Sequence, residues 1–377
     1  MFCVSGESQV LKILLDFRTK PNYAPVIDLV NELSKKFSVF FIPNKRFHPA
    51  GLSNSVVCCR ETDVHTIKPN VVFSTYSSLL IIAYLKARLK LPIVNYVFSY
   101  MLMKDVLSKK FLALPDSYKL WEIMNLMALS FPKSLLMPDR LIVPNIMIKK
   151  ELALLGFHED RMVVLPWGLN VDKYQSRAFS LMDPSTDSCD NVIVYTGPLH
   201  PLRFPMALIY SFSGILKQNG DARLLLLFRK DLWNHGLYKK LISAIRKLGL
   251  QKKVSIVIPT SHESYLSFVA RSTVVVLPYF SSGIVEVPPL TLLECMALSK
   301  PVITTHGIAT YGIIEDGVNG FVLSENNSSL TDIISFVIFN RKKAQDVGRK
   351  AKIFVHDKFN LTKFSQNLSR ILEICGS

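Results

Sequence analysis

Two glutamates, Glu286 and Glu294, are separated by seven residues in the segment 281–305, which reads SSGIVEVPPLTLLECMALSKPVITT. Glu286 precedes a predicted helix, and Glu294 lies on it. Pro289 suits the first helical position, because the N–H groups of a first turn have no partner within the helix. Those free amides favour an anion, and a carboxylate on the helix face can accept hydrogen bonds from two ribose hydroxyls. The segment predicts a site for a phosphate-bearing ligand rich in hydroxyls, unless each glutamate is a solvated surface charge.

The elements that must position this segment are short apolar runs that alternate with helical patterns. Most runs lack the strict alternation of a half-exposed strand, which is typical of parallel strands covered by helices on both faces. The predicted strands are LKILLDF, FSVFFIP, PNVVFST, LPIVNYV, DRLIVPN and RMVVLPW in the first half, and NVIVYTG, ARLLLLF, KVSIVIP, STVVVLP, KPVITTH and NGFVLSE in the second. Helical patterns lie between them, at residues 25–35, 206–218, 237–248 and 290–298. This order predicts an α/β fold with right-handed crossovers.

A polar segment at residues 174–190, YQSRAFSLMDPSTDSCD, interrupts the alternation and has the composition of a linker. We therefore predict two doubly wound, Rossmann-like domains at residues 1–175 and 191–356, joined by a linker at 176–190. The apolar spacing of residues 357–377 predicts a terminal amphipathic helix. In such folds ligands bind outside the carboxyl ends of the strands, so we expect a cleft there.

One predicted connection is unusually long. Residues 101–137 combine Leu, Met and Phe with five lysines, and loops of this length commonly carry helices or a function. Two interpretations stay open: extra helices that pack on the core, or a basic amphipathic surface that receives a lipid or a membrane. The lysines are Lys104, Lys109, Lys110, Lys119 and Lys133.

Composition excludes several classes of protein. With 49% hydrophobic residues the chain is not disordered, and its longest apolar run, residues 71–85, is shorter than the ~20 residues that span a bilayer. The chain has 45 Lys and Arg against 29 Asp and Glu, and this net charge of +16 favours anionic partners. No RNA-binding motif or basic stripe with interleaved aromatics is present, so we expect no nucleic acid partner. The six cysteines lack zinc-site spacing, and we expect Cys58 and Cys59 to be buried free thiols.

The segment 281–305 resembles the Glu-x7-Glu motif of family 4 glycosyltransferases (glycosyl transferases group 1), which are retaining enzymes of the GT-B fold. Three further segments resemble the family in the expected order. VLPWGLNVDKY at 164–174 is similar to its Pro-x-Gly-Val-Asp segment, VYTGPLHPLRFP at 194–205 to its Gly-Arg-x4-Lys-Gly loop, and GIIEDGVNGFVL at 312–323 to its Val-x-Asp-Gly-x-x-Gly-Phe-Leu stretch. The resemblance covers about residues 139–375.

The resemblance implies a role for each candidate residue. Glu294 would hold the ribose hydroxyls of a nucleotide sugar, Glu286 would contact the transferred sugar, and Arg203 stands where the family has a diphosphate-binding Lys. The resemblance assigns the rest of the nucleotide site to Gly197, Leu290 and Thr291. The glycine would let its loop approach the nucleotide, while the two backbone amides and the threonine hydroxyl would face the phosphates. An Arg and helix-terminus amides can stabilise a departing diphosphate, so no metal is expected.

The chain also departs from the family pattern. Pro198 replaces an Arg, Val287-Pro288-Pro289 replaces a Gly-Phe-Gly, and the first loop, DFRTKPNYAP, lacks the family's Gly pair. Proline has no N–H, so two possible amide donors to the sugar are missing. These departures keep an alternative open, in which the chain is a catalytically weak GT-B protein that acts as a partner or regulatory subunit.

The resemblance thus implies a GT-B protein whose first domain faces the acceptor, whose second binds the nucleotide sugar, and whose terminal helix crosses back to the first. We expect a hexosyl-type, metal-independent transferase that acts on an acceptor glycan or a lipid-linked acceptor. We expect a cytoplasmic protein, with peripheral contact at the anionic cytoplasmic membrane face as an open alternative.

Overall fold

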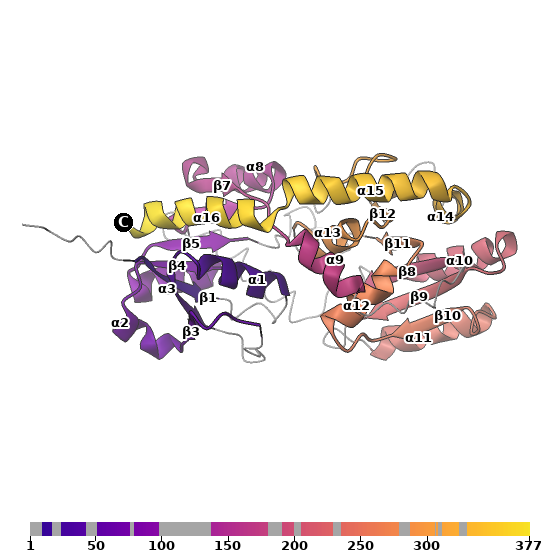
Figure 1. The fold of residues 1–377 in the computed structure, drawn as a ribbon, viewed down its shortest axis with the longest axis horizontal. Coiled ribbons are helices and arrows are strands. Elements are labelled where there is room, and N and C mark those ends of the chain that lie inside the picture. The colour runs from indigo at the N-terminus through magenta and orange to yellow at the C-terminus, as the bar shows by residue number, and fades with distance from the viewer. Residues whose placement is uncertain are drawn as a thin grey trace, which may run out of the picture. The chain divides into compact units, whose positions relative to one another are not determined.

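A computed structural model of the chain describes residues 10–16, 24–42, 51–75, 79–97, 137–179, 191–199, 205–228, 235–278, 287–305, 307, 311–323 and 330–377. These residues divide into two compact units (Figure 1). The first unit contains the described chain up to Gly168 and again from Leu361, and the second contains Leu169 to Asn360. Each unit has a sheet and a core of its own.

Seven described strands form the sheet of the first unit, in the order β3-β2-β1-β4-β5-β6-β7, and all neighbours are parallel. Their bounds are β1 (Lys12–Asp16), β2 (Ser38–Ile42), β3 (Val56–Cys58), β4 (Val71–Ser74), β5 (Ile93–Tyr96), β6 (Arg140–Val143) and β7 (Met162–Val164). The helices of this unit are α1 (Ala24–Leu33), α2 (Val64–Ile67), α3 (Leu79–Leu89), α8 (Ile146–Leu154) and α16 (Leu361–Gly376). The central strands are buried along their whole length, as the apolar runs predict.

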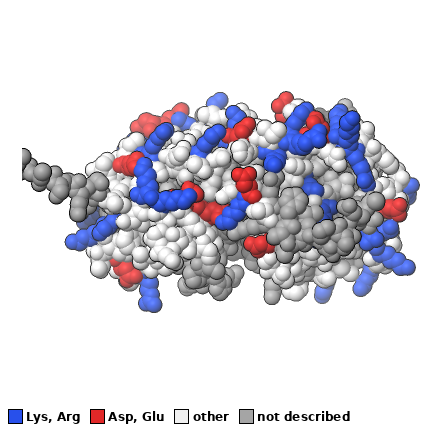
Figure 2. Space-filling view, viewed as in Figure 1, with Lys and Arg blue, Asp and Glu red and all other residues white. Residues whose placement is uncertain are grey.

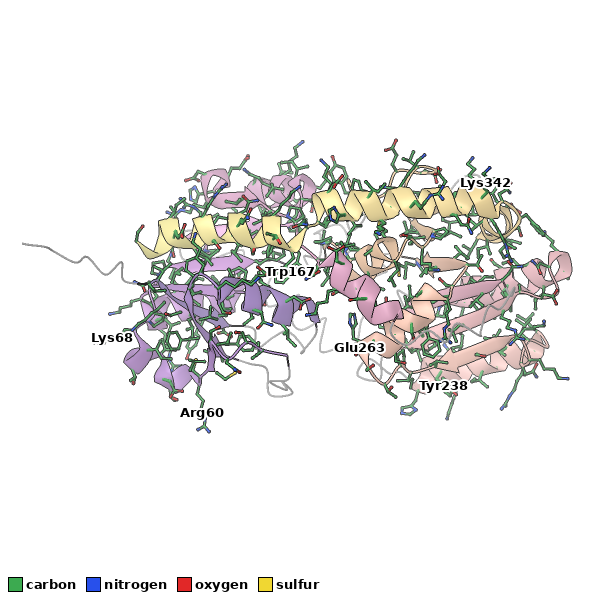
Figure 3. All side chains as sticks on the ribbon, viewed as in Figure 1. Arg60, Lys68, Trp167, Tyr238, Glu263 and Lys342 are labelled. Atoms are coloured by element: carbon green, nitrogen blue, oxygen red, sulfur yellow. The ribbon has the colours of Figure 1, made fainter. Side chains whose placement is uncertain are left out.

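The terminal helix α16 packs in the first unit, against α1, β4 and β5. Phe364 of this helix lies 4.9 Å from Trp167, ring centre to ring centre, and Trp167 lies 5.3 Å from Tyr96 at the end of β5 (Figure 3). All three rings are buried. Each aromatic pair of this geometry stabilises the fold by about 0.5–1.5 kcal/mol, in addition to the stabilisation that comes from burying the ring surface. The C-terminal segment is therefore part of the first unit's core, although it follows the second unit in the sequence.

Six described strands form the sheet of the second unit, in the order β10-β9-β8-β11-β12-β13, again with parallel neighbours. Their bounds are β8 (Val192–Gly197), β9 (Arg223–Phe228), β10 (Val254–Val257), β11 (Val274–Leu277), β12 (Val302–Thr305) and β13 (Phe321–Leu323). The helices are α9 (Val171–Phe179), α10 (Met206–Gln218), α11 (His235–Lys247), α12 (His262–Ala270), α13 (Leu290–Ala297), α14 (Leu330–Phe339) and α15 (Arg341–Lys358).

Helix α15 lies directly on the turn that follows α13. A Cβ atom added at Gly348 would lie 2.1 Å from the carbonyl oxygen of Ser299, so only glycine allows the two backbones to approach this closely. The contact fixes the end of α13, and with it the helix that carries Glu294.

The structure confirms the predicted fold class of two doubly wound α/β domains with parallel sheets, and every predicted strand is present. One strand was not predicted, β3, which has three residues and lies at the edge of its sheet. This edge position also corrects the expectation for Cys58 and Cys59. Both thiols are free as expected, but Cys58 is exposed and Cys59 is half-buried, because nothing in the described sheet covers the outer side of β3.

The long connection falls almost entirely outside the described residues. Only its last residue, Met137, is described, and its side chain is fully buried. Within the described parts of the chain, no helix has both the length and the apolar composition needed to cross a membrane.

Candidate functional site

The carboxyl ends of the central strands of the second sheet bring the predicted nucleotide residues to one edge. Strand β8 ends at Gly197, and its neighbour β11 runs parallel to it, with Val276 opposite Tyr195. The Thr304 hydroxyl of β12 donates a hydrogen bond of 2.9 Å to the carbonyl of Leu277, the last residue of β11. The carboxyl ends of β8 and β11 therefore lie at the same edge of the sheet.

The first turn of α13 leaves its leading amides outside the helical hydrogen bonds. The N–H groups of Leu292 and Leu293 donate to the carbonyl of Pro289, at 2.9 and 3.1 Å. The N–H groups of Leu290 and Thr291 precede these first bonds, and Pro289 has no side chain that could cap them. The side chain of Leu290 is buried and that of Thr291 is half-buried. Both residues thus have the backbone arrangement that the family resemblance assigns to the phosphate contacts.

Glu294 lies one turn further along α13 and is buried, with 6% of its surface exposed. Its Oε1 atom lies 3.0 Å from Nε2 of His262, the first residue of α12. Ser261 caps α12 by accepting a hydrogen bond of 3.1 Å from the Ser264 N–H, which fixes the start of the helix and so the position of the imidazole. A buried carboxylate is costly unless it is hydrogen-bonded, and the imidazole supplies such a bond.

Two tyrosines flank the imidazole. The ring of Tyr265 stacks on His262 at 5.8 Å between ring centres, and the ring of Tyr174 meets it edge-on at 5.4 Å. Tyr174 belongs to α9, which packs on both α12 and α13. Three helices therefore hold the pair of His262 and Glu294, while the histidine side chain keeps 26% of its surface exposed.

A buried thiol lies on α13, and a largely buried amine follows the helix. The hydroxyl of Tyr265 lies 3.9 Å from the Cys295 sulfur, and burial, together with the charge of Glu294, raises the pKa of that thiol. Lys300 follows α13, and its Nζ donates to the carbonyl of Ser272 at 3.0 Å. Burial lowers the pKa of Lys300 to about 8. Neither residue is among those that the sequence indicated for the site.

Two predicted site residues, Glu286 and Arg203, lie outside the described residues, and their assignments stay predictions. Gly197, Leu290, Thr291 and Glu294 are described and belong to the same edge of one unit. Within the described ranges, no group of three His, Cys, Asp or Glu side chains is placed to bind a metal ion.

Sequence reasoning also missed His262, which contacts Glu294 directly. It is 32 residues from Glu294 in the sequence, and only the packing of α12 on α13 brings the two side chains together. The available signal was its position directly after a capping serine, at the start of a helix that follows a strand.

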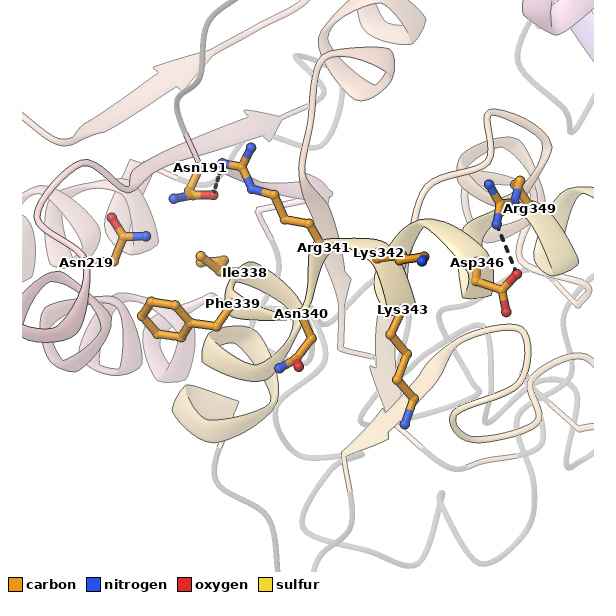
Figure 4. Close-up of a pocket in the computed structure, with 10 residues that line it drawn as sticks. All are labelled: Asn191, Asn219, Ile338, Phe339, Asn340, Arg341, Lys342, Lys343, Asp346 and Arg349. Carbon is orange, nitrogen blue, oxygen red and sulfur yellow. Dashed lines mark hydrogen bonds and ion pairs between the residues drawn. The ribbon is translucent and has the colours of Figure 1, made fainter.

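A cavity of about 950 Å³ lies elsewhere in the second unit, where α14 meets α15 (Figure 4). Arg341 donates a hydrogen bond of 2.7 Å to the side chain of Asn191, which precedes β8, so the cavity lies at the amino end of that strand. The Phe339 ring, which is 59% exposed, also lines it. The cavity is therefore separate from the carboxyl edge that carries Glu294.

A known family model matches the part of the chain that carries this geometry. Residues 183–354 match the family model of glycosyl transferases group 1. The matched range contains every described strand of the second sheet, together with Gly197, Leu290, Thr291 and Glu294.

Two curated relatives match part of the chain. Spore coat protein SA of Bacillus subtilis is 20% identical over 190 residues, which are 48% of this chain and 48% of the relative. The uncharacterized glycosyltransferase MJ1178 of Methanocaldococcus jannaschii is 29% identical over 138 residues, 36% of this chain and 38% of the relative. The matches span less than half the length of these relatives.

Solved structures resemble the whole chain. Anabaena Alr3699/HepE in complex with UDP-glucose has a TM-score of 0.72 at 18% identity, over 97% of this chain and 100% of that one. A glycosyltransferase from Rickettsia africae has a TM-score of 0.70 at 15% identity, over 97% and 99%. WaaG, a glycosyltransferase involved in lipopolysaccharide biosynthesis, has a TM-score of 0.68 at 13% identity, over 96% and 99%. At such low identity the likeness shows the fold, which is GT-B.

Proposed function

We propose that the protein is a retaining, family 4 glycosyltransferase that moves a hexosyl group from a nucleotide sugar to an acceptor hydroxyl. One observation carries the proposal. The buried carboxylate of Glu294 lies one turn beyond the free amides of α13, at the carboxyl edge of the sheet, within the residues that match glycosyl transferases group 1. This arrangement suits a ribose beside a diphosphate. The neighbour HepE, solved with UDP-glucose, supports a nucleotide sugar as the ligand class.

The chemistry of the proposed reaction centres on the departing diphosphate. The bond between the anomeric carbon and a phosphate oxygen breaks, a bond to the acceptor oxygen forms, and the acceptor hydroxyl loses its proton. Negative charge grows on the diphosphate as its bond breaks. The amides of Leu290 and Thr291, with the guanidinium of Arg203, would stabilise that charge, while Glu286 would hold the sugar.

Metal independence belongs to the same proposal. The charges that the reaction creates can be balanced by an arginine and by the positive end of α13, without a divalent cation. Transfer or donor hydrolysis that persists in EDTA supports this part, and loss of activity that Mg²⁺ or Mn²⁺ restores contradicts it.

We further propose that the acceptor is lipid-linked or presented at an anionic membrane on its cytoplasmic face. Besides the lysines of residues 101–137, the described chain offers a basic helix, α15 (Figure 2), with exposed apolar side chains just before it and within it. Phe339, just before α15, is 59% exposed and Ile353 is 60% exposed. Such a pairing of cations with exposed apolar side chains suits the headgroup region. The charged residues of α15 are Arg341, Lys342, Lys343, Arg349, Lys350, Lys352 and Lys358 against Asp346 and Asp357.

A panel of UDP, GDP and ADP sugars tests the donor proposal through the melting temperature, with EDTA present. A ligand at 100 times its dissociation constant adds about 2.7 kcal/mol to the free energy of unfolding, which should raise the melting temperature by several degrees at most. Donor hydrolysis or transfer by the purified protein then separates an enzyme from a catalytically weak partner subunit. A protein that binds a nucleotide sugar but never turns it over would support the weak subunit, which the prolines at 198, 288 and 289 motivate.

A further inference from the structure

The pair of His262 and Glu294 suggests how the donor site selects its nucleotide. We infer that His262 is a positioning residue: it orients the Glu294 carboxylate so that the site recognises the 2′- and 3′-hydroxyls of a ribonucleotide. This inference rests on the proposed function, because it assumes that a nucleoside diphosphate binds at Glu294.

The two oxygens of the Glu294 carboxylate differ in their contact with His262. Nε2 of His262 lies 3.0 Å from Oε1, so this contact engages one oxygen of Glu294 and does not use the other, Oε2. Two vicinal hydroxyls need a carboxylate whose plane is fixed, since a freely rotating group pays conformational entropy for each bond it forms. A hydrogen bond from the imidazole fixes that plane before the nucleotide arrives.

The imidazole is itself held in place. The capped start of α12 fixes its backbone, Tyr265 stacks on one ring face at 5.8 Å, and Tyr174 of α9 meets it edge-on at 5.4 Å. A positioning group acts only when its own rotamer is locked, and here two aromatic rings restrict it. The ring is nevertheless 26% exposed, which is consistent with a place at the rim of a ligand site and not in the centre of a core.

A purely structural role is the opposing interpretation, in which His262 only satisfies a buried carboxylate. The two roles predict different responses to the nucleotide. A structural defect weakens the binding of every nucleotide alike, whereas a positioning defect affects only ligands that carry the two ribose hydroxyls.

Two conservative substitutions separate these roles. In His262→Gln, the side-chain NH₂ group can occupy the position of the histidine Nε2. In His262→Asn, the NH₂ group lies near the position of Nδ1, and the shorter side chain does not reach Oε1 of Glu294. His158→Asn is the matched control, because His158 is an exposed histidine of the first unit. Dissociation constants are measured by calorimetry for whichever of UDP, ADP and GDP binds the wild type best, and for its 2′,3′-dideoxy counterpart.

We expect His262→Asn to raise the dissociation constant for the ribonucleotide by tenfold or more, about 1.4 kcal/mol, and to leave that for the dideoxynucleotide within twofold. His262→Gln should stay within about threefold of the wild type for both. Equal weakening of both nucleotides by His262→Asn would overturn the inference, as would no weakening of either, and the proposed function would stand in both cases. A wild-type protein that binds none of the three nucleotides contradicts the proposed function itself, and the inference with it.

Discussion

Two charged side chains of the second unit, Glu294 within α13 and Lys300 just after its end, are held in different ways. Glu294 is buried on the helix and has an imidazole 3.0 Å away that can donate a hydrogen bond and carry a positive charge. Lys300 follows the helix, and its amine donates to a neutral carbonyl, that of Ser272. Among the described residues, no carboxylate lies within ion-pair distance of that amine.

We interpret Glu294 as a side chain that binds a ligand and Lys300 as one whose burial affects the stability of the fold. The carboxylate has an imidazole beside it that forms an ion pair with it when protonated, and it follows the free amides of a helix start, where a phosphate-bearing ligand can bind. The Lys300 amine has no described carboxylate or imidazole beside it. Burial lowers its pKa to about 8, so the protonated amine destabilises the folded state. We therefore expect changes at Glu294 to affect mainly binding and changes around Lys300 to affect mainly unfolding.

The largest effect is expected for Glu294→Ala. Hydrogen bonds to a charged group contribute about 1.5–3 kcal/mol, so loss of the carboxylate should weaken nucleoside diphosphate binding by roughly tenfold to 100-fold. Calorimetric titration measures this, with Glu373→Ala as a control, since Glu373 is a surface residue that pairs with Lys36 in the first unit. Unchanged nucleotide affinity in a folded Glu294→Ala protein would remove this residue from the site.

Gly348→Ala tests whether the end of α13 is rigidly fixed. The added methyl group would lie 2.1 Å from the Ser299 oxygen, and such overpacking costs about 1–3 kcal/mol of unfolding free energy. Gly214→Ala, in helix α10, is the control. The added Cβ would lie 3.4 Å from its nearest neighbour, the side chain of Thr331 in α14, which is an ordinary van der Waals distance. Urea unfolding should show a lower midpoint for Gly348→Ala and no loss for Gly214→Ala. Equal midpoints for both would contradict the close contact.

Lys300→Met tests the stability cost of the buried amine through its pH dependence. In the window between pH 8 and the ordinary value of 10.5, the unfolded chain binds a proton that the folded chain does not, so the wild type gains stability as the pH rises. Allowing for partial contact with water, the gain is about 2 kcal/mol. Lys300→Met should therefore be more stable than the wild type at pH 7, and its advantage should shrink towards pH 10.5.

Exposed lysines provide the control for that measurement. Lys252→Met removes a charge on the surface. Its free energy of unfolding should therefore differ from that of the wild type by the same amount at pH 7 and at pH 10.5. An advantage of Lys300→Met that is the same at both pH values would show that the protonated amine is not destabilising in the fold.

The smallest effect per residue is expected at the basic helix α15. Each lysine near anionic lipid contributes about 1 kcal/mol, so Lys342→Glu with Lys343→Glu should reduce co-sedimentation with anionic vesicles by tenfold or more. Lys239→Glu with Lys240→Glu makes the same charge change on α11 and is expected to have less effect. Equal and negligible binding of the wild type to anionic and neutral vesicles at low salt would refute the membrane proposal. An equal loss in both double variants would assign the attraction to net charge.

The sequence predicted the sheets well because their strands are continuous apolar runs that only a doubly covered sheet can bury. Strand β3 escaped prediction because its apolar run, Val56 to Cys59, is shorter than the others and lies at an exposed edge of the sheet. The predicted Glu294 could be found from its spacing after Pro289. Its partner could not, since the contact with His262 depends on how α12 packs on α13, and no local pattern encodes a pairing between residues so far apart.

We propose above all that a nucleoside diphosphate binds at the carboxyl edge of the second sheet through Glu294. A crystal structure of the protein with the tightest-binding nucleoside diphosphate tests this most directly. We predict both ribose hydroxyls within about 2.5–3.0 Å of the Glu294 carboxylate and the phosphates at the amides of Leu290 and Thr291. A nucleotide bound elsewhere, such as in the cavity between α14 and α15, with Glu294 still paired only to His262, would contradict the account.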